Sequence, residues 1–308
     1  MRSLLAMQAQ KLCLASMLML REVDTRDPLA VAARVRADYL SMFVDADRQF
    51  IPRVFSWAID CFHGRHPDYL PIDARYHDLE HTLQGVLCLS ALLRGRHEAK
   101  DSPAIQRSLF ELALLAILFH DTGYLKRRDD TTGTGAKYTV THVSRSCEFA
   151  EMFLLNQGLA PAAIRSVQNM IRCTGMGANV AAIPFQSDAE RIGGFALGTA
   201  DLLGQMAASD YVEKLPVLYE EFVEAGRYNG NPGAVGFASV DDLVRKTPGF
   251  WEKYVFPKIT SDFRGLFRYL ARPAPSGTND YLSRIEANLR RIRELNGAVT
   301  PQLGIGLM

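Results

Sequence analysis

The chain has 308 residues, of which 48% are hydrophobic and 22% charged, a composition that excludes disorder over most of its length. Its 35 basic and 34 acidic side chains leave a net charge of +1, so the chain lacks the strong positive field that attracts nucleic-acid polymers. The five cysteines are dispersed without a CxxC spacing, which favours a reducing compartment. We therefore expect a cytoplasmic protein that binds no nucleic-acid polymer.

The N-terminal stretch is apolar but interrupted by Gln8, Gln10 and Lys11, whereas a signal peptide needs an unbroken apolar region. We interpret residues 1–27 as an N-terminal helical extension. The remaining apolar runs are too short or too interrupted to span a bilayer, so no membrane partner is expected.

The hydrophobic periodicity downstream is helical, and alternating β-branched segments are almost absent. The expected helices are 28–45, 48–63, 78–95, 104–120, 139–157, 161–173, 187–208 and 209–226, with three more within 238–296. The pattern predicts one all-α domain over residues 28–296, followed by a tail over 297–308.

Two loops interrupt this pattern, at residues 122–138 and 226–237, and neither is a domain linker because helices resume on both sides. The first loop contains Gly133 and Gly135, with no expected apolar anchor before Tyr138. We predict that it is mobile and acts as a lid.

His120 and Asp121 end the predicted helix 104–120, whose run LFELALLAILF is apolar on every side except Glu111. The helix must therefore be buried, and its end carries two polar groups inward. Burying such groups is costly unless they are paired or bind a metal.

Asp201 is likewise a carboxylate within a predicted helix of small and apolar residues, GGFALGTADLLGQMA. His77 and His81 are four residues apart at the start of the helix predicted over 78–95, so they project from one face. Two imidazoles and two carboxylates from three buried helices would suit a transition-metal site with room for water.

The ordered motifs Tyr76–His81 (YHDLEH), Ala116–Asp121 (AILFHD) and Thr199–Leu202 (TADL) resemble the H…HD…D signature of HD-domain metal-dependent phosphohydrolases. The closest similarity is to class I cyclic nucleotide phosphodiesterases, whose first motif differs at one fixed position. Cys173–Met176 is similar to a further motif of that family. The similarity covers about residues 70–225 and implies an HD-type helical catalytic domain.

The resemblance implies that His81, His120, Asp121 and Asp201 ligate a divalent metal, with Mn, Mg, Zn and Fe all open. Asp121 would also bridge to a second metal and hold the attacking hydroxide, and His77 would be the general acid. The implied reaction is attack of a metal-activated hydroxide on a phosphomonoester or phosphodiester of a small molecule, such as a nucleotide or cyclic nucleotide.

Departures from the phosphodiesterase pattern concern the second metal and the base. The family's extra histidine after HD falls at Gly123–Leu125, and its further metal-linked aspartate is Gly175, so a second metal has fewer protein ligands. His142 is the best remaining ligand, with a solvent-facing helix start as an equal alternative. The purine-holding glutamine is missing, since only Gln302 follows Gln205.

Candidate phosphate-binding cations lie beside the motifs. Lys126 opens a basic cluster after HD, although a solvated loop is the alternative there. Arg75 and Arg172 flank the other motifs, and a guanidinium can bind a phosphoryl group through two hydrogen bonds.

Two other functions remain open from the sequence. HD-type di-iron oxygenases typically add histidines between HD and the last aspartate, and here only His142 lies in that interval. A non-catalytic regulatory HD module would not need all four ligands. The sequence also leaves a homo-oligomer open.

Overall fold

The structure, a computed structural model, describes residues 23–230 and 236–298. Over these residues the protein is all-α and contains no strand, which confirms the predicted fold class. Most of the expected N-terminal extension and tail, residues 1–22 and 299–308, lie outside the described residues.

The helices follow the predicted order with ends shifted by a few residues. They are α2 (Pro28–Met42), α3 (Phe50–Phe62), α4 (Leu79–Glu98), α5 (Arg107–Phe119), α6 (His142–Asn156), α7 (Pro161–Ile171), α8 (Asp188–Met206), α9 (Tyr211–Tyr228), α10 (Val240–Phe250) and α11 (Asp280–Ala298). Between α10 and α11 the chain makes π-helical turns at 251–255 and 258–262 and a 3₁₀ turn at 266–270. The start expected for the tail, residue 297, falls inside α11.

Side-chain caps fix several of the helix starts. The Asp78 carboxylate accepts a hydrogen bond from the His81 backbone N–H at 2.8 Å, which begins α4 two residues before its histidine. Ser187 caps α8 through the Glu190 N–H, and Pro161 occupies the first turn of α7. The Asp78 cap therefore fixes where His81 enters α4.

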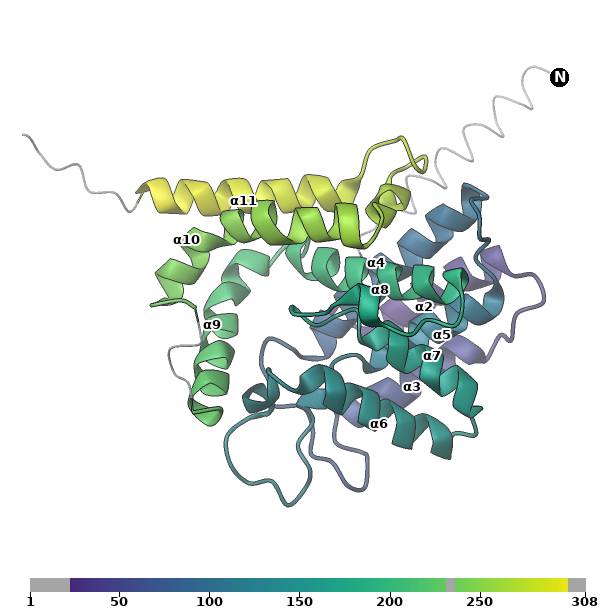
Figure 1. Cartoon of the computed structure of the whole chain (residues 1–308), viewed down its shortest axis with the longest axis horizontal. Helices are drawn as coiled ribbons and strands as arrows, with labels where there is room; N and C mark the ends of the chain where they lie inside the picture. The colour runs from purple at the N-terminus through teal and green to yellow at the C-terminus, as the bar shows by residue number, and fades with distance from the viewer. Residues whose placement is uncertain (1–22, 231–235, 299–308) are drawn as a thin grey trace, which may run out of the picture.

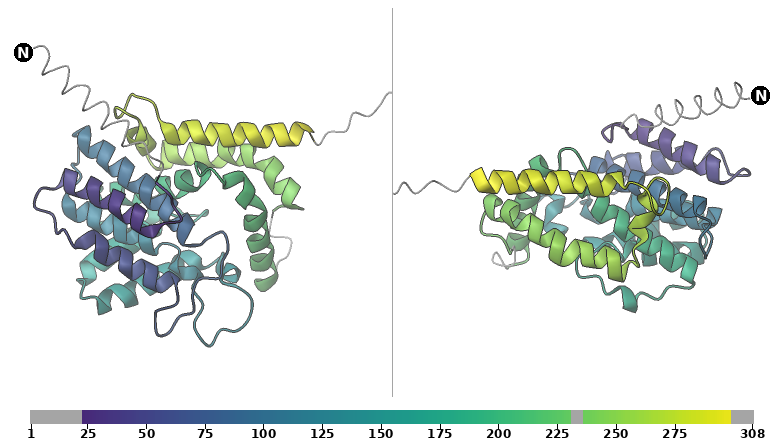
Figure 2. Two further views of the ribbon diagram at one scale, coloured as in Figure 1. Left: turned by 180° about the vertical axis from the view of Figure 1, so that it is seen from behind. Right: turned by 90° about the horizontal axis from the view of Figure 1, so that it is seen from above.

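Helix α5 lies at the centre of the bundle, in contact with α4, α7 and α8 (Figure 1). Its residues from Ala113 to Phe119 are all buried, as its all-round apolar sequence predicts. Helices α10 and α11 run side by side across one end of the bundle (Figure 2).

Helices α4 and α8 form the most extensive pair, and two glycines let them approach closely. A Cβ at Gly204 would lie 2.8 Å from the Gln84 carbonyl oxygen and 2.9 Å from the Gly85 Cα. Because His81 and Asp201 lie one turn from these glycines, the close packing brings their side chains together. None of the helices in the described part of the chain has both the length and the apolar character needed to cross a membrane.

Candidate metal centre

His81, His120 and Asp121 form a buried group whose ligand atoms lie within 4.8 Å of one another, and Asp201 lies beside both imidazoles. His81 comes from the first turn of α4, the His120–Asp121 pair follows α5, and Asp201 lies within α8. His81 Nε2 is 3.3 Å from Asp121 Oδ2 and 3.4 Å from Asp201 Oδ1. His120 Nε2 is 3.2 Å and 3.4 Å from the same two oxygens. The structure thus brings together the four residues that the resemblance assigns to one metal.

The donor set fits a divalent cation. Metal–ligand bonds of about 2.0–2.3 Å hold neighbouring ligand atoms about 3–4 Å apart, as these nitrogens and oxygens are. His120 Nε2 and Asp121 Oδ2 are buried without a well-aligned hydrogen-bond partner, which a cation would supply. His120 Nδ1 lies 2.7 Å from the Ile117 carbonyl oxygen, so this nitrogen donates its proton and Nε2 keeps a lone pair.

The pKa values of the four groups reflect their mutual proximity. Burial lowers the pKa of His81, but the Asp121 and Asp201 carboxylates outweigh burial and raise it to about 9. The same balance raises the pKa of His120 well above its ordinary value. Burial raises the pKa of Asp201, while the two imidazoles outweigh it and bring it down to about 2. Without metal, the centre therefore holds protons on its histidines at neutral pH.

We accordingly expect metal binding to release protons. A cation needs neutral imidazoles, so its affinity should rise as pH increases from 7 to about 9, the pKa of His81. Calorimetric titration with Mn²⁺ in buffers of different ionisation enthalpy would count the protons released. Equal affinity across this pH range, without proton release, would contradict these ligands.

His77 is positioned beside the metal centre by a buried glutamate. His77 Nδ1 lies 2.6 Å from Glu221 Oε2, and the Tyr76 N–H donates to the other carboxylate oxygen at 2.7 Å. The His77 ring stacks on Tyr124, with centroids 4.5 Å apart. Burial raises the pKa of Glu221, but the His77 imidazole outweighs burial and lowers it. Glu221 therefore accepts the Nδ1 proton and leaves His77 Nε2 for another partner.

Glu221 is a site residue that the sequence did not predict. It lies in α9, 144 residues from His77, within the polar stretch YEEFVEAGRY. Its neighbour Glu220 is of the same type but exposed. Only the helical phase, which puts Glu221 on the face of Leu215 and Leu218, distinguishes the two.

His142 opens α6 close to the four central residues. Its Nε2 is 4.0 Å from Asp121 Oδ1, and its Nδ1 is 2.6 Å from the Thr139 carbonyl oxygen. The side chain is 17% exposed, so the solvent-facing alternative does not describe it. Burial lowers the pKa of His142 and so favours the neutral form that ligates metals.

Gly123 is the residue that admits His142 to the centre. A Cβ at this position would lie 2.0 Å from the His142 carbonyl oxygen, and backbone atoms cannot withdraw as a flexible side chain can. In the sequence, the glycine directly after His120–Asp121–Thr122 is therefore the feature that could have indicated the close approach of His142.

We expect Gly123→Ala to push the start of α6 away and to lower the free energy of unfolding by about 1–3 kcal/mol. Denaturant titration would measure this loss. Gly249→Ala is the matched control, because a Cβ on this α10 residue meets nothing within 4 Å. Equal stability of the two variants would show that the contact at Gly123 does not constrain α6.

The loop over residues 122–138 is not the free lid that its composition predicts. Tyr124 and Leu125 are fully buried and anchor its start. The Gly135 N–H donates to Asp73 Oδ1 at 2.6 Å, and the buried Lys137 pairs with Asp130. The predicted lack of an apolar anchor was wrong, because Tyr124 and Leu125 lie so close to His120 and Asp121 that they were counted with the polar loop.

Of the three candidate phosphate-binding cations, the structure brings only Arg172 to the site. The Arg75 side chain is 68% exposed and pairs with Glu220 at 2.9 Å. Lys126 is buried, 2.7 Å from Asp73 Oδ2, and donates to the Gly133 carbonyl. Arg172 lines the pocket described next.

A pocket of about 580 Å³ opens onto the metal centre. One end is polar and includes His77, His81, Asp121 and Asp201. The rest is mainly apolar and is formed by α8, α9, α10 and the segments around residues 139–143 and 172–178. A ligand in this pocket would therefore touch the metal centre at one end and a hydrophobic wall at the other.

A family model described as Npun_R2479-like matches residues 128–273. The matched segment contains His142 and Asp201, and it leaves out His81 and His120. It spans less than half of the chain, and its description names no activity. No curated protein matches the chain.

Proposed function

We propose that the protein is an HD-type, metal-dependent phosphohydrolase that cleaves a phosphomonoester or phosphodiester of a small molecule. The observation that carries the proposal is the convergence of His81, His120, Asp121 and Asp201 on one buried point that opens into a pocket. These residues fit one divalent cation, Mn, Mg, Zn or Fe. His142 beside Asp121 is the candidate ligand for a second.

A bound divalent cation would lower the pKa of a coordinated water and screen charge on the phosphoryl oxygens. Asp121 has a second oxygen, Oδ1, that faces His142 and can orient the attacking water by hydrogen bonding. The negative charge of the substrate would be matched by the Arg172 guanidinium, which already donates one N–H to Asn169 at 2.8 Å.

His77 supports the leaving-group side of this chemistry. With Nδ1–H donated to Glu221, the protonated ring would present Nε2–H to the leaving oxygen. The Glu221 carboxylate holds the ring in place, as an orienting carboxylate does for a general acid. The side chain is 16% exposed and lines the pocket, so it can reach a bound substrate.

The proposal is tested by assaying purified, full-length protein against a panel of phosphorylated metabolites with Mn²⁺, Mg²⁺, Zn²⁺ and Fe²⁺ in turn. We expect phosphate release that depends on the added metal. Oxygen uptake with Fe²⁺ is measured in parallel. If the metal-loaded protein hydrolyses no phosphoester but consumes oxygen with an organic substrate, the result would favour a di-iron oxygenase. Metal binding with neither activity would favour a regulatory module.

A further inference from the structure

We propose that the pocket beside the metal centre takes a phosphoester whose alcohol part is an apolar hydrocarbon group, rather than a nucleoside. The phosphoester itself rests on the proposed function, whereas the hydrocarbon site rests on the pocket alone. The two parts can therefore fail separately.

The hydrophobic wall begins directly at the metal ligands. Leu202 follows Asp201 on α8, and Met206 lies one turn further along the same helix. Leu218 and Phe222 face them from α9, and Phe250 closes the wall from α10. A phosphoryl group at the metal would therefore place its alcohol substituent against aliphatic and aromatic side chains, where burial of hydrocarbon is favourable.

Two polar side chains in this wall, Gln205 and Thr247, are already paired, whereas the lining Tyr124 hydroxyl has no hydrogen-bond partner among the described residues. Gln205 accepts a hydrogen bond from the Tyr76 hydroxyl at 2.8 Å and donates one to the Asp201 carbonyl at 3.1 Å. The Thr247 hydroxyl donates to the Leu243 carbonyl at 2.9 Å. A nucleobase bound here would find fewer free partners than it has polar edge atoms, which weakens binding, whereas a hydrocarbon requires none.

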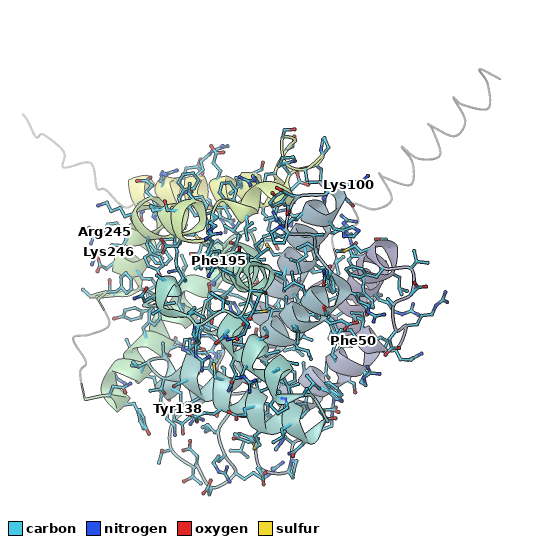
Figure 3. All side chains as sticks on the ribbon, turned by 45° about the vertical axis from the view of Figure 1, so that its right-hand side comes forward. Phe50, Lys100, Tyr138, Phe195, Arg245 and Lys246 are labelled. Carbon is cyan, nitrogen blue, oxygen red and sulfur yellow. The ribbon has the colours of Figure 1, made fainter. Side chains whose placement is uncertain are left out.

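The mouth of the pocket has the same character. Its most exposed hydrophobic side chains, Val140 and Met176, are 72% and 62% exposed. Lys246 is the lining cation besides Arg172, and it lies beside Arg245 at the edge of the molecule (Figure 3). Its ammonium pairs with Asp242 at 2.7 Å, so its charge is already neutralised and does not call for a second anionic group on the ligand. The pocket thus matches a ligand with one anionic head and a hydrocarbon body.

The test is calorimetric binding of alkylphosphonates to the full-length, Mn²⁺-loaded protein, below their micellar concentrations. These probes contain a carbon–phosphorus bond and are not hydrolysed as esters. We expect affinity to rise from methyl- through butyl- to decylphosphonate by at least tenfold, with adenosine monophosphate weaker than decylphosphonate. Equal affinity along the series, or tighter binding of the nucleotide, would overturn the proposal.

Leu218→Asn should weaken decylphosphonate at least tenfold more than methylphosphonate, because Leu218 belongs to the hydrophobic wall rather than to the polar end of the pocket. Leu295→Asn is the matched control, since Leu295 lies on α11 and is 47% exposed. The wild-type series decides the question even if Leu218→Asn does not fold. Chain-length-dependent binding without hydrolysis of any phosphoester would keep the hydrocarbon site and reject the hydrolase.

Discussion

Asp201→Ala should abolish metal binding and phosphoester turnover together. Its Oδ1 lies 3.4 Å from Nε2 of both His81 and His120. Among the described residues, Asp121 is the one other buried carboxylate that contacts both imidazoles, and it already occupies its own position. Removing the Asp201 carboxylate takes away one ligand oxygen and one negative charge, so the three remaining side chains are less able to hold a cation. Metal content by mass spectrometry and phosphate release would be measured on the same preparation.

Asp188→Ala is the control for this variant. Asp188 lies on the same helix, but its side chain is 69% exposed and pairs with Arg191. This control should retain both metal and activity. An Asp201→Ala protein that keeps its metal would show that Asp201 is a partner of the histidines rather than a ligand.

His77→Ala should keep the metal and lose turnover by about 10²–10⁴-fold, the usual contribution of a general acid. The expected separation follows from geometry, since His77 Nδ1 is committed to Glu221 and the ring stacks on Tyr124 rather than joining the central four. Metal content and kcat, measured against pH, give the two readouts. Glu221→Gln should lower kcat by about 10–100-fold, as loss of an orienting carboxylate does, and shift the pH profile.

His63→Ala provides the control, because His63 is exposed and lies outside the pocket lining. It should leave metal content and kcat unchanged. If metal content in His77→Ala falls as steeply as in His81→Ala, then His77 is a ligand and the division between ligand and acid is wrong.

The fold was accessible from the sequence because helical periodicity, caps and an all-apolar α5 are local signals. The His120–Asp121 pair was also accessible, since two polar groups at the end of a buried helix require partners. Glu221 was not, because its partner lies 144 residues away and only the helical phase distinguishes it from Glu220. Arg75 shows the converse: it adjoins His77 in sequence, yet its side chain points to solvent and pairs with Glu220.

The apolar anchors of the loop over residues 122–138 were not predicted, for a related reason. Composition averaged over the loop hid Tyr124 and Leu125, two residues whose burial fixes its path. A glycine just after a helix commonly ends it, and in the structure Gly123 also makes room for His142. Its second role depends on a contact across the fold that spacing alone does not reveal.

The most direct test of the metal centre is anomalous diffraction from crystals of the full-length protein grown with Mn²⁺. The account predicts one strong peak within about 2.0–2.3 Å of His81 Nε2, His120 Nε2 and the Asp121 and Asp201 carboxylates. A weaker peak near His142 would mark a second ion. Crystals in which these four side chains hold no ion, or in which the ion binds elsewhere, would contradict the account.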